Sequence, residues 1–139
     1  MGYRSEVAIT MDTKNYNVMI RRAKALKNKH IYNLIDYADI YTADNGKITT
    51  LYWGYVKWYQ DYKEVQWIEN FIKKIDATFV RIGEDRDDNE ELYYNNGDGF
   101  FEYTYYRRSI EIEGIKQEKQ SEENELFDEL LDEIDRRLW

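Results

Sequence analysis

The aromatic stretch YWGYVKWYQDY, residues 52–62, places the strongest constraint on how this chain can fold. Side chains alternate between the two faces of a β-strand, so residues 51–59 would divide into two sets if they formed one. One face would carry Leu51, Trp53, Tyr55, Lys57 and Tyr59, and the other would carry Tyr52, Gly54, Val56 and Trp58. The side chains of both sets are apolar enough that they should be buried. We therefore predict that helices pack against one face of the sheet. The second face would then meet water, a partner protein or a further helix.

Periodic apolar residues on either side of this stretch predict a chain of mixed strands and helices. The predicted strands are residues 3–11, 39–43, 47–59, 78–82, 92–95 and 100–105, with one more at 108–112. Between them, three segments repeat apolar residues at helical spacing. Their apolar faces consist of Tyr16, Met19, Ile20, Ala23 and Leu26, then Ile31, Leu34 and Ile35, then Val65, Ile68, Phe71, Ile72 and Ile75.

Two glycine-containing turns predict how the strands are joined. Asn45-Gly46 is typical of a two-residue hairpin turn and would join the second and third strands. The sequence Asn96-Gly97-Asp98-Gly99 predicts a second hairpin near the end of the sheet. The resulting element order predicts an α+β two-layer sandwich, in which two helices pack on a mostly antiparallel sheet related to the ferredoxin-like plan.

The C-terminal segment is predicted to lie outside this domain. Residues 1–113 would form the α+β domain, 114–120 a polar linker, and 121–139 an acidic amphipathic helix. The apolar stripe of that helix consists of Phe127, Leu130, Leu131, Ile134 and Leu138. A lone helix of about 18 residues is marginal in water, so this one should dock on its own chain or in a symmetric homodimer. The polar linker favours the dimer.

Charge is distributed unevenly along the chain, whose net charge is −8. Residues 14–29 are basic and contain no acid, whereas residues 84–91 and 118–139 are strongly acidic. An acidic protein is repelled by phosphate backbones, which argues against direct binding of nucleic acid. The same charge favours a basic partner, including a protein that itself binds nucleic acid.

Few residues are available for catalysis, cofactor binding or metal binding. The chain has no Cys, no Ser with a recognisable base, and a single histidine, His30, which is expected at the surface. The acidic residues 84–91 have the spacing of the start of an EF-hand loop, but Glu90 stands where that loop needs Gly and Asn96 where it needs Glu. We therefore predict a solvated acidic loop with no metal, no cofactor and no enzymatic activity.

The candidate site residues are instead those suited to binding a partner. They are Asp85, Asp87, Asp88, Glu90 and Glu91 in the acidic segment, and Trp53, Tyr55, Lys57 and Tyr59 in the aromatic stretch. No apolar run reaches the roughly 18 residues that a membrane span requires, and no signal peptide is recognisable, so we expect a soluble cytoplasmic protein with no membrane contact.

Three segments resemble a family of small uncharacterised proteins encoded by bacteriophages and prophages. They are GYRSEVAI (2–9), YVKWYQDYKEVQWIENFI (55–72) and FVRIGEDRDD (79–88), and the resemblance covers most of residues 2–113. The family brings no catalytic residues to carry over. The resemblance implies a phage accessory protein in the cytoplasm of the host cell.

Small acidic phage proteins of this kind often inhibit host machinery, and anti-CRISPR proteins are among them. By that analogy we expect a non-enzymatic inhibitor of a host protein, plausibly a nucleic-acid-binding defence effector, with an acidic surface that mimics nucleic acid. One alternative is a small-ligand or nucleotide-binding module that uses the aromatic sheet face. Another is an oligomeric structural or regulatory protein.

Overall fold

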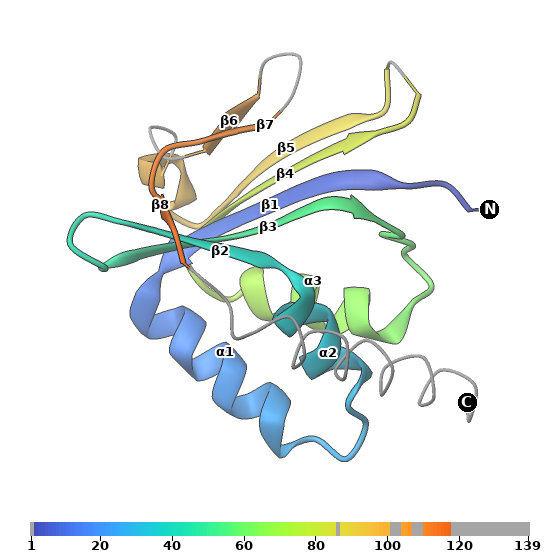
Figure 1. Ribbon diagram of the computed structural model, residues 1–139, viewed down its shortest axis with the longest axis horizontal. Helices are drawn as coiled ribbons and strands as arrows, with labels where there is room; N and C mark the ends of the chain where they lie inside the picture. The colour runs from blue at the N-terminus through green and yellow to red at the C-terminus, as the bar shows by residue number, and fades with distance from the viewer. Residues whose placement is uncertain (1, 86, 101–103, 107–109, 118–139) are drawn as a thin grey trace.

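The computed structural model describes residues 2–85, 87–100, 104–106 and 110–117 (Figure 1). The strands are β1 (Ser5–Asp12), β2 (Asp39–Ala43), β3 (Ile48–Val56), β4 (Ala77–Gly83), β5 (Asn89–Tyr94), β6 (Thr104–Tyr106), β7 (Ile110–Ile112) and β8 (Ile115–Lys116). The helices are α1 (Thr13–Ala25), α2 (His30–Tyr37) and α3 (Lys63–Ile72), with a short 3₁₀ helix η1 (Gly97–Phe100). No helix within these residues is long and apolar enough to cross a membrane.

The main sheet has the strand order β5-β4-β1-β3-β2-β8, and every neighbouring pair is antiparallel. Its inner strands follow the order β4-β1-β3-β2 along a β-α-β-β-α-β path, which is the ferredoxin-like arrangement. Helices α1, α2 and α3 lie together on one side of the sheet (Figure 1). The predicted α+β two-layer sandwich is confirmed, and the segment near residues 31–35 supplies α2 as an additional helix.

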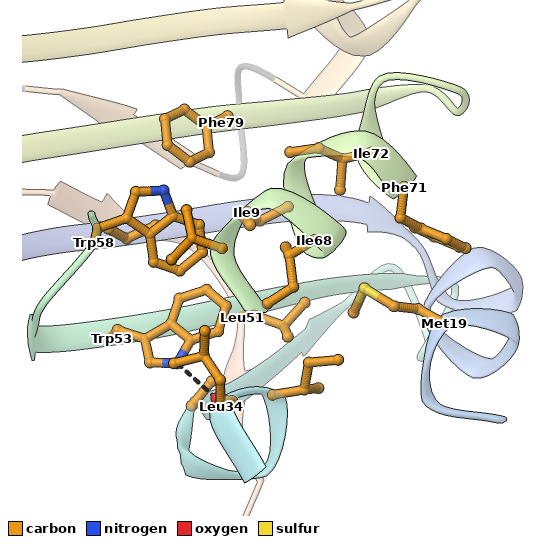
Figure 2. Packing of buried hydrophobic residues seen from close by; sticks show 14 of the residues in the cluster. Ile9, Met19, Leu34, Leu51, Trp53, Trp58, Ile68, Phe71, Ile72 and Phe79 are labelled. Carbon is orange, nitrogen blue, oxygen red and sulfur yellow. Dashed lines mark hydrogen bonds between the residues drawn. The ribbon is translucent and has the colours of Figure 1, made fainter. Parts of the chain in front are cut away.

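The core lies between the sheet and the three helices. Alternate residues of β1 point toward the helices, and Ile9 pairs with Leu51 of β3 on one side and Phe79 of β4 on the other. Ile68 and Ile72 of α3 are fully buried against this layer (Figure 2). The strand alternation and the helical spacing in the sequence therefore identify the same core from both layers.

A β-bulge interrupts the alternation of β3. The register passes from Val7 opposite Trp53 to Ser5 opposite Val56, so β3 has one more residue than β1 at this point. Trp53 and Val56 both face the core as a result, whereas Tyr55 is 68% exposed. The prediction that Trp53 and Tyr55 share one face is wrong, because the extra residue reverses the order of the faces.

The opposite face of the sheet is covered in part by the β6–β7 hairpin. Ile110 of β7 packs against Ala8 of β1 and Val80 of β4, with Tyr52 at the margin of this smaller cluster. The prediction of a hairpin between residues 92–95 and 100–105 is wrong. Strand β5 pairs with β4, and β6 pairs with β7.

The 3₁₀ helix η1 replaces the turn predicted for the second hairpin. A Cβ at Gly97 would overlap the backbone carbonyl of Ala77, so η1 approaches the start of β4 more closely than any other residue would allow. Thr78 Oγ1 donates a hydrogen bond of 2.6 Å to the Gly97 carbonyl. This close packing directs the chain away from β5 and toward the opposite face of the sheet.

The other predicted hairpin joins β2 to β3, but residues 44–47 connect the strands in place of the predicted two-residue turn, with Asp44, Asn45 and Gly46 all at positive φ. At the far end of the described chain, β8 pairs with β2, and the Gln117 N–H donates to the Ile40 carbonyl at 2.6 Å. Part of the predicted 114–120 linker is thus attached to the sheet. The predicted helix at 121–139, with its stripe of Phe127, Leu130, Leu131, Ile134 and Leu138, lies outside the described residues.

Candidate functional site

The predicted site residues that reach the surface gather at one end of the sheet. This is the end where β1 begins, β3 ends and β4 turns into β5 (Figure 1). The N-terminal segment Gly2–Arg4 connects them, because it runs between the end of β3 and the β4–β5 turn. We call this surface the acidic end and define it by Arg4, Tyr55, Glu84, Asp85 and Asp87.

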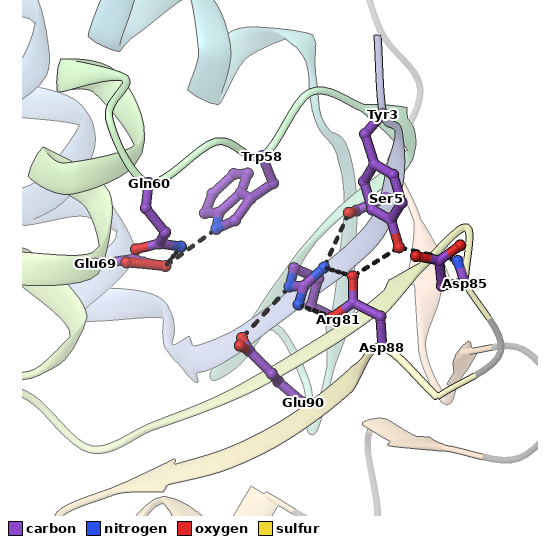
Figure 3. A network of polar contacts seen from close by, with 9 residues as sticks. All are labelled: Tyr3, Ser5, Trp58, Gln60, Glu69, Arg81, Asp85, Asp88 and Glu90. Carbon is purple, nitrogen blue, oxygen red and sulfur yellow. Dashed lines mark hydrogen bonds and ion pairs between the residues drawn. The ribbon is translucent and has the colours of Figure 1, made fainter.

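A buried arginine, Arg81, supports the acidic end through hydrogen bonds. Arg81 lies on the helix-facing side of β4 and is only 9% exposed. Its guanidinium donates two hydrogen bonds to Asp88, at 3.1 and 2.5 Å, and others to Glu90 at 3.4 Å and Ser5 Oγ at 3.2 Å (Figure 3). A buried charge requires such partners, and the bonds to Asp88 and Glu90 raise the pKa of Arg81 well above its usual range.

Asp88 is fixed from two directions. In addition to the Arg81 contact, it accepts a 2.7 Å hydrogen bond from the Tyr3 hydroxyl. These hydrogen bonds, that from Arg81 first, lower the pKa of Asp88 to about 2. Gly83 lies directly against Tyr3 and Asp88, where a Cβ would overlap both side chains. The loop therefore closes tightly onto the N-terminal segment.

The same tyrosine also holds the tip of the loop. The Asp85 N–H donates to the Tyr3 hydroxyl at 2.9 Å, and the Arg4 N–H donates to Glu84 Oε1 at 2.8 Å. The side chains of Glu84, Asp85 and Asp87 are exposed around this anchored backbone. Glu84, Asp85 and Asp88 are thus each attached to the N-terminal segment, while the carboxylates of Asp85 and Asp87 face solvent.

The five predicted acids consequently divide into two groups. Asp88 and Glu90 pair with Arg81, so much of their charge is compensated within the protein. Asp85, Asp87 and Glu91 face solvent. Glu91 also accepts a 2.7 Å hydrogen bond from the Tyr93 hydroxyl. Partial burial and this hydrogen bond raise the pKa of Tyr93 to about 12.

The predicted aromatic residues divide in the same way. Trp53 is in the core, where its Nε1 donates a 2.9 Å hydrogen bond to the Leu34 carbonyl (Figure 2). Tyr55 is exposed at the acidic end, with the Arg4 guanidinium 5.1 Å from its ring centroid. Lys57 and Tyr59 are half-buried beside Gly2, close enough that a Cβ on Gly2 would overlap the Tyr59 hydroxyl.

The segment that follows Tyr55 is tied to α3. Glu69 Oε1 accepts hydrogen bonds of 3.1 Å from both Trp58 Nε1 and Gln60 Nε2 (Figure 3). Trp58 itself is 4% exposed and packs against Trp53, with ring centroids 5.1 Å apart. The position of Tyr55 is therefore set by buried contacts on either side of it.

Sequence reasoning missed the three residues that build this site, Tyr3, Arg4 and Arg81. A signal for Arg81 was available, because it is the one charged residue in the otherwise apolar run Phe79 to Ile82. Charged residues within such a run are usually paired. Tyr3 and Arg4 gave no signal, since their partners lie about 80 residues away in the sequence.

Two other predicted features lie elsewhere. His30 was expected at the surface, but it is 5% exposed at the start of α2, so that expectation is wrong. On the open side of the sheet, Tyr41 and Tyr52 form an edge-to-face pair with centroids 6.3 Å apart. Burial, followed by charge and hydrogen bonding from Glu6, raises the pKa of Tyr52 to about 12.

Across the described ranges, no three acidic or histidine side chains gather closely enough to hold a metal ion. The acidic end places the exposed carboxylates of Asp85 and Asp87 at the same end of the sheet as the exposed ring of Tyr55. Comparisons with protein-family models, with curated proteins and with solved structures found no match to this chain.

Proposed function

We propose that this chain is a non-enzymatic binding protein whose acidic end contacts a basic surface on another protein. The observation that carries this proposal is the Arg81–Asp88–Tyr3 network, which holds Asp88 and the backbone of Asp85 against the N-terminal segment without a partner. A preorganised surface loses little conformational entropy on binding, so more of its contact energy contributes to affinity.

The composition of the acidic end fits a protein partner. Tyr55 offers a large ring at 68% exposure, and tyrosine is among the residues that dominate binding energy at protein interfaces. Asp85 and Asp87 stand beside it as exposed carboxylates. Complementary charge of this kind mainly increases the association rate and the selectivity for a basic partner.

The resemblance to phage-encoded proteins suggests which basic partner to consider. Host proteins that bind nucleic acid carry basic grooves. A row of carboxylates can occupy such a groove in place of phosphates. We therefore propose an inhibitor of a host nucleic-acid-binding protein, of the anti-defence or anti-CRISPR type. Binding of nucleic acid by the chain itself is not part of this proposal.

The nucleotide-binding alternative has less support. It required an aromatic sheet face, but Trp53 and Trp58 both belong to the core. Among the described residues, the Tyr41–Tyr52 pair offers edge-to-face rings on the opposite face, but the nearby Glu6 would repel a phosphate. The oligomeric alternative depends on residues 121–139, which the described ranges do not include.

A site-specific photocrosslinker tests the proposed surface. It would replace Tyr55 in one variant and Asn45, in the hairpin turn at the opposite end of β3, in the other. We expect the probe at position 55 to capture a basic host protein from bacterial lysate, and the probe at position 45 not to capture it.

The specificity of that capture is checked by matched charge changes. Asp85→Asn with Asp87→Asn should abolish it, while Asp44→Asn with Asp98→Asn should not. All four are exposed aspartates, but Asp44 and Asp98 lie at the other end of the sheet. Equal capture at positions 55 and 45, or equal loss in both double variants, would contradict the proposal.

A further inference from the structure

We propose that the outer edge of β5 pairs with an extended basic segment of the partner, which adds a strand to the sheet. This inference rests on the proposed function and names the form in which the partner binds. Strand β5, which contributes Glu90 and Glu91, directly follows the acidic loop and is the outermost strand at one edge of the sheet. Addition of a strand to an open edge is a common mode of peptide recognition.

The edge of β5 is long and accessible. Among the described residues β5 pairs only with β4, and residues 89–93 are all exposed. The other edge strand, Ile115–Lys116, has only 2 residues. Natural sheets usually protect a long open edge, because its unpaired backbone groups attract other strands. Within the described part of the chain, the edge of β5 at Glu91 and Tyr93 is therefore a candidate site for binding next to the acidic loop.

The register identifies the backbone groups that a partner would meet. The Gly83 N–H donates to the Asp88 carbonyl at 2.7 Å, so the carbonyl at this position points toward β4, while the Asp88 N–H donates within the turn to the Asp85 carbonyl. Residues of an antiparallel strand alternate in this respect. Glu90, Leu92 and Tyr94 therefore also bond toward β4, whereas Glu91 and Tyr93 direct their N–H and C=O groups outward.

The side chains of β5 select the kind of strand that can bind. Glu91 and Tyr93 lie on the face that β6 and β7 share, and Glu90 and Leu92 lie on the helix side, as their pairing with β4 shows. Each face therefore offers one carboxylate and one apolar surface, with Leu92 at 41% and Tyr93 at 39% exposure. A strand in which pairs of basic residues alternate with pairs of apolar residues would match both faces, because successive side chains point to opposite faces.

Charge also excludes a second copy of β5 as the occupant. Two β5 strands paired edge to edge would bring Glu90 and Glu91 of each copy close to those of the other, and like charges across a strand pair are destabilising. Carboxylates on this edge therefore oppose self-association while attracting Lys and Arg. Glu90 and Glu91 therefore make the edge selective for a basic partner, and the same two residues oppose pairing between two copies of β5.

Two synthetic peptides of about eight residues, a usual strand length, separate strand addition from charge attraction alone. The first repeats the sequence Lys-Lys-Val-Val, which places both basic and apolar residues on each face of the strand. The second has the same sequence but carries an N-methyl group on every backbone amide, which removes the donors along both edges and leaves every side-chain charge in place. Amide hydrogen exchange of the full chain is measured by nuclear magnetic resonance with each peptide.

We expect the first peptide to protect the amides of Glu91 and Tyr93. When about nine-tenths of the protein is bound, their exchange should slow by about tenfold, because only the unbound fraction exchanges. Glu90 and Leu92, already bonded to β4, serve as internal controls and should change little. The N-methylated peptide should give no protection at Glu91 or Tyr93.

Two outcomes would overturn this inference. Equal binding of both peptides without protection of Glu91 and Tyr93 would show attraction by charge alone, and the proposed acidic binding surface would survive while strand addition would not. Protection confined to residues away from β5 would place the peptide elsewhere and contradict strand addition directly. Failure of the crosslinking experiment at position 55, by contrast, bears on the proposed function itself.

Discussion

Asp88 is the single residue on which the order of the acidic end depends most. Its folded-state pKa of about 2 lies below the value of about 3.9 expected in an unfolded chain. A lowered carboxyl pKa stabilises the folded state above the unfolded pKa, and that stability disappears as pH falls through the folded pKa. The contribution of Asp88 should therefore be complete near pH 6 and lost between about pH 4 and pH 2.

The variant Asp88→Asn should reduce the free energy of unfolding by about 1 kcal/mol near neutral pH. The value is at the low end for a charged hydrogen bond because the Asp88 side chain is 36% exposed, and water screens the pair. Urea unfolding at several pH values would measure the difference between the two proteins. It should shrink toward zero near pH 2, and a difference that stayed constant down to that pH would rule out the ion pair as its source.

Gly97 and Gly99 form a matched pair within η1. Gly97→Ala places a methyl group against the Ala77 carbonyl and should cost about 1 to 3 kcal/mol of stability, as overpacking usually does. Gly99→Ala meets no atom within 4 Å and should change stability by less than about 0.5 kcal/mol. Thermal unfolding would measure both variants. Similar costs for the two would show that η1 is not packed closely on β4.

At the scale of elements, the bulge in β3 decides what the aromatic stretch does. Trp53→Phe removes the indole that donates to the Leu34 carbonyl and leaves that buried acceptor without its donor. The smaller ring also leaves a cavity, and together these should cost about 2 kcal/mol. Tyr55→Ala, at an exposed position, should change stability by less than about 0.5 kcal/mol.

Chemical denaturation of both variants measures this contrast. Tyr55→Ala should weaken partner binding although it changes stability little. Trp53→Phe should lower stability but leave partner binding unchanged at temperatures where the protein remains folded. If Tyr55→Ala destabilised the fold as much as Trp53→Phe, the two side chains would share the core, and the bulge would not separate them.

The sequence was sufficient to predict elements whose periodicity is regular. Strand β1 alternates without interruption, and α1 to α3 repeat their apolar residues at helical spacing, so each was located to within a few residues. The fold class followed from the order of these elements. The Asn45-Gly46 turn likewise identified the hairpin, because positive φ values are a local requirement.

The features that the sequence could not predict depend on contacts between distant segments. The bulge in β3 exists because of its register with β1, and η1 forms where Gly97 packs on Ala77. Tyr55, Asp85 and Asp87, which the sequence suggested as binding residues, lie at the same end of the sheet. What joins them, Tyr3 with the 85–88 loop, spans 85 residues of sequence between hydrogen-bonded partners.

At the scale of the whole molecule, opposite charges occupy different parts of the protein. Among the described residues, the basic side chains of α1 and the following turn are exposed on the helical layer, and the acidic end lies at one end of the sheet. The separation gives the molecule two surfaces of opposite sign. A basic partner is therefore attracted in one orientation, with the acidic end leading.

The C-terminal segment can be removed at a point that the structure defines. Since Gln117 is bonded to β2, truncation after Gln117 keeps β8 in the sheet. We expect this truncation to convert a dimer into a monomer and to lower the melting temperature, because the apolar stripe of residues 127–138 would be lost from its docking surface. Light scattering and calorimetry measure these two effects. An unchanged mass and melting temperature would show that the segment docks on nothing in the isolated protein.

The most direct test of the central claim is the salt dependence of affinity for the captured partner. Isothermal titration would compare the natural chain with the Asp85→Asn, Asp87→Asn variant and the Asp44→Asn, Asp98→Asn variant over a range of salt concentrations. If the acidic end makes the contact, affinity should fall steeply with salt, and only the first variant should flatten that dependence. Equal salt dependence in all three proteins would show that the acidic end is not the binding surface.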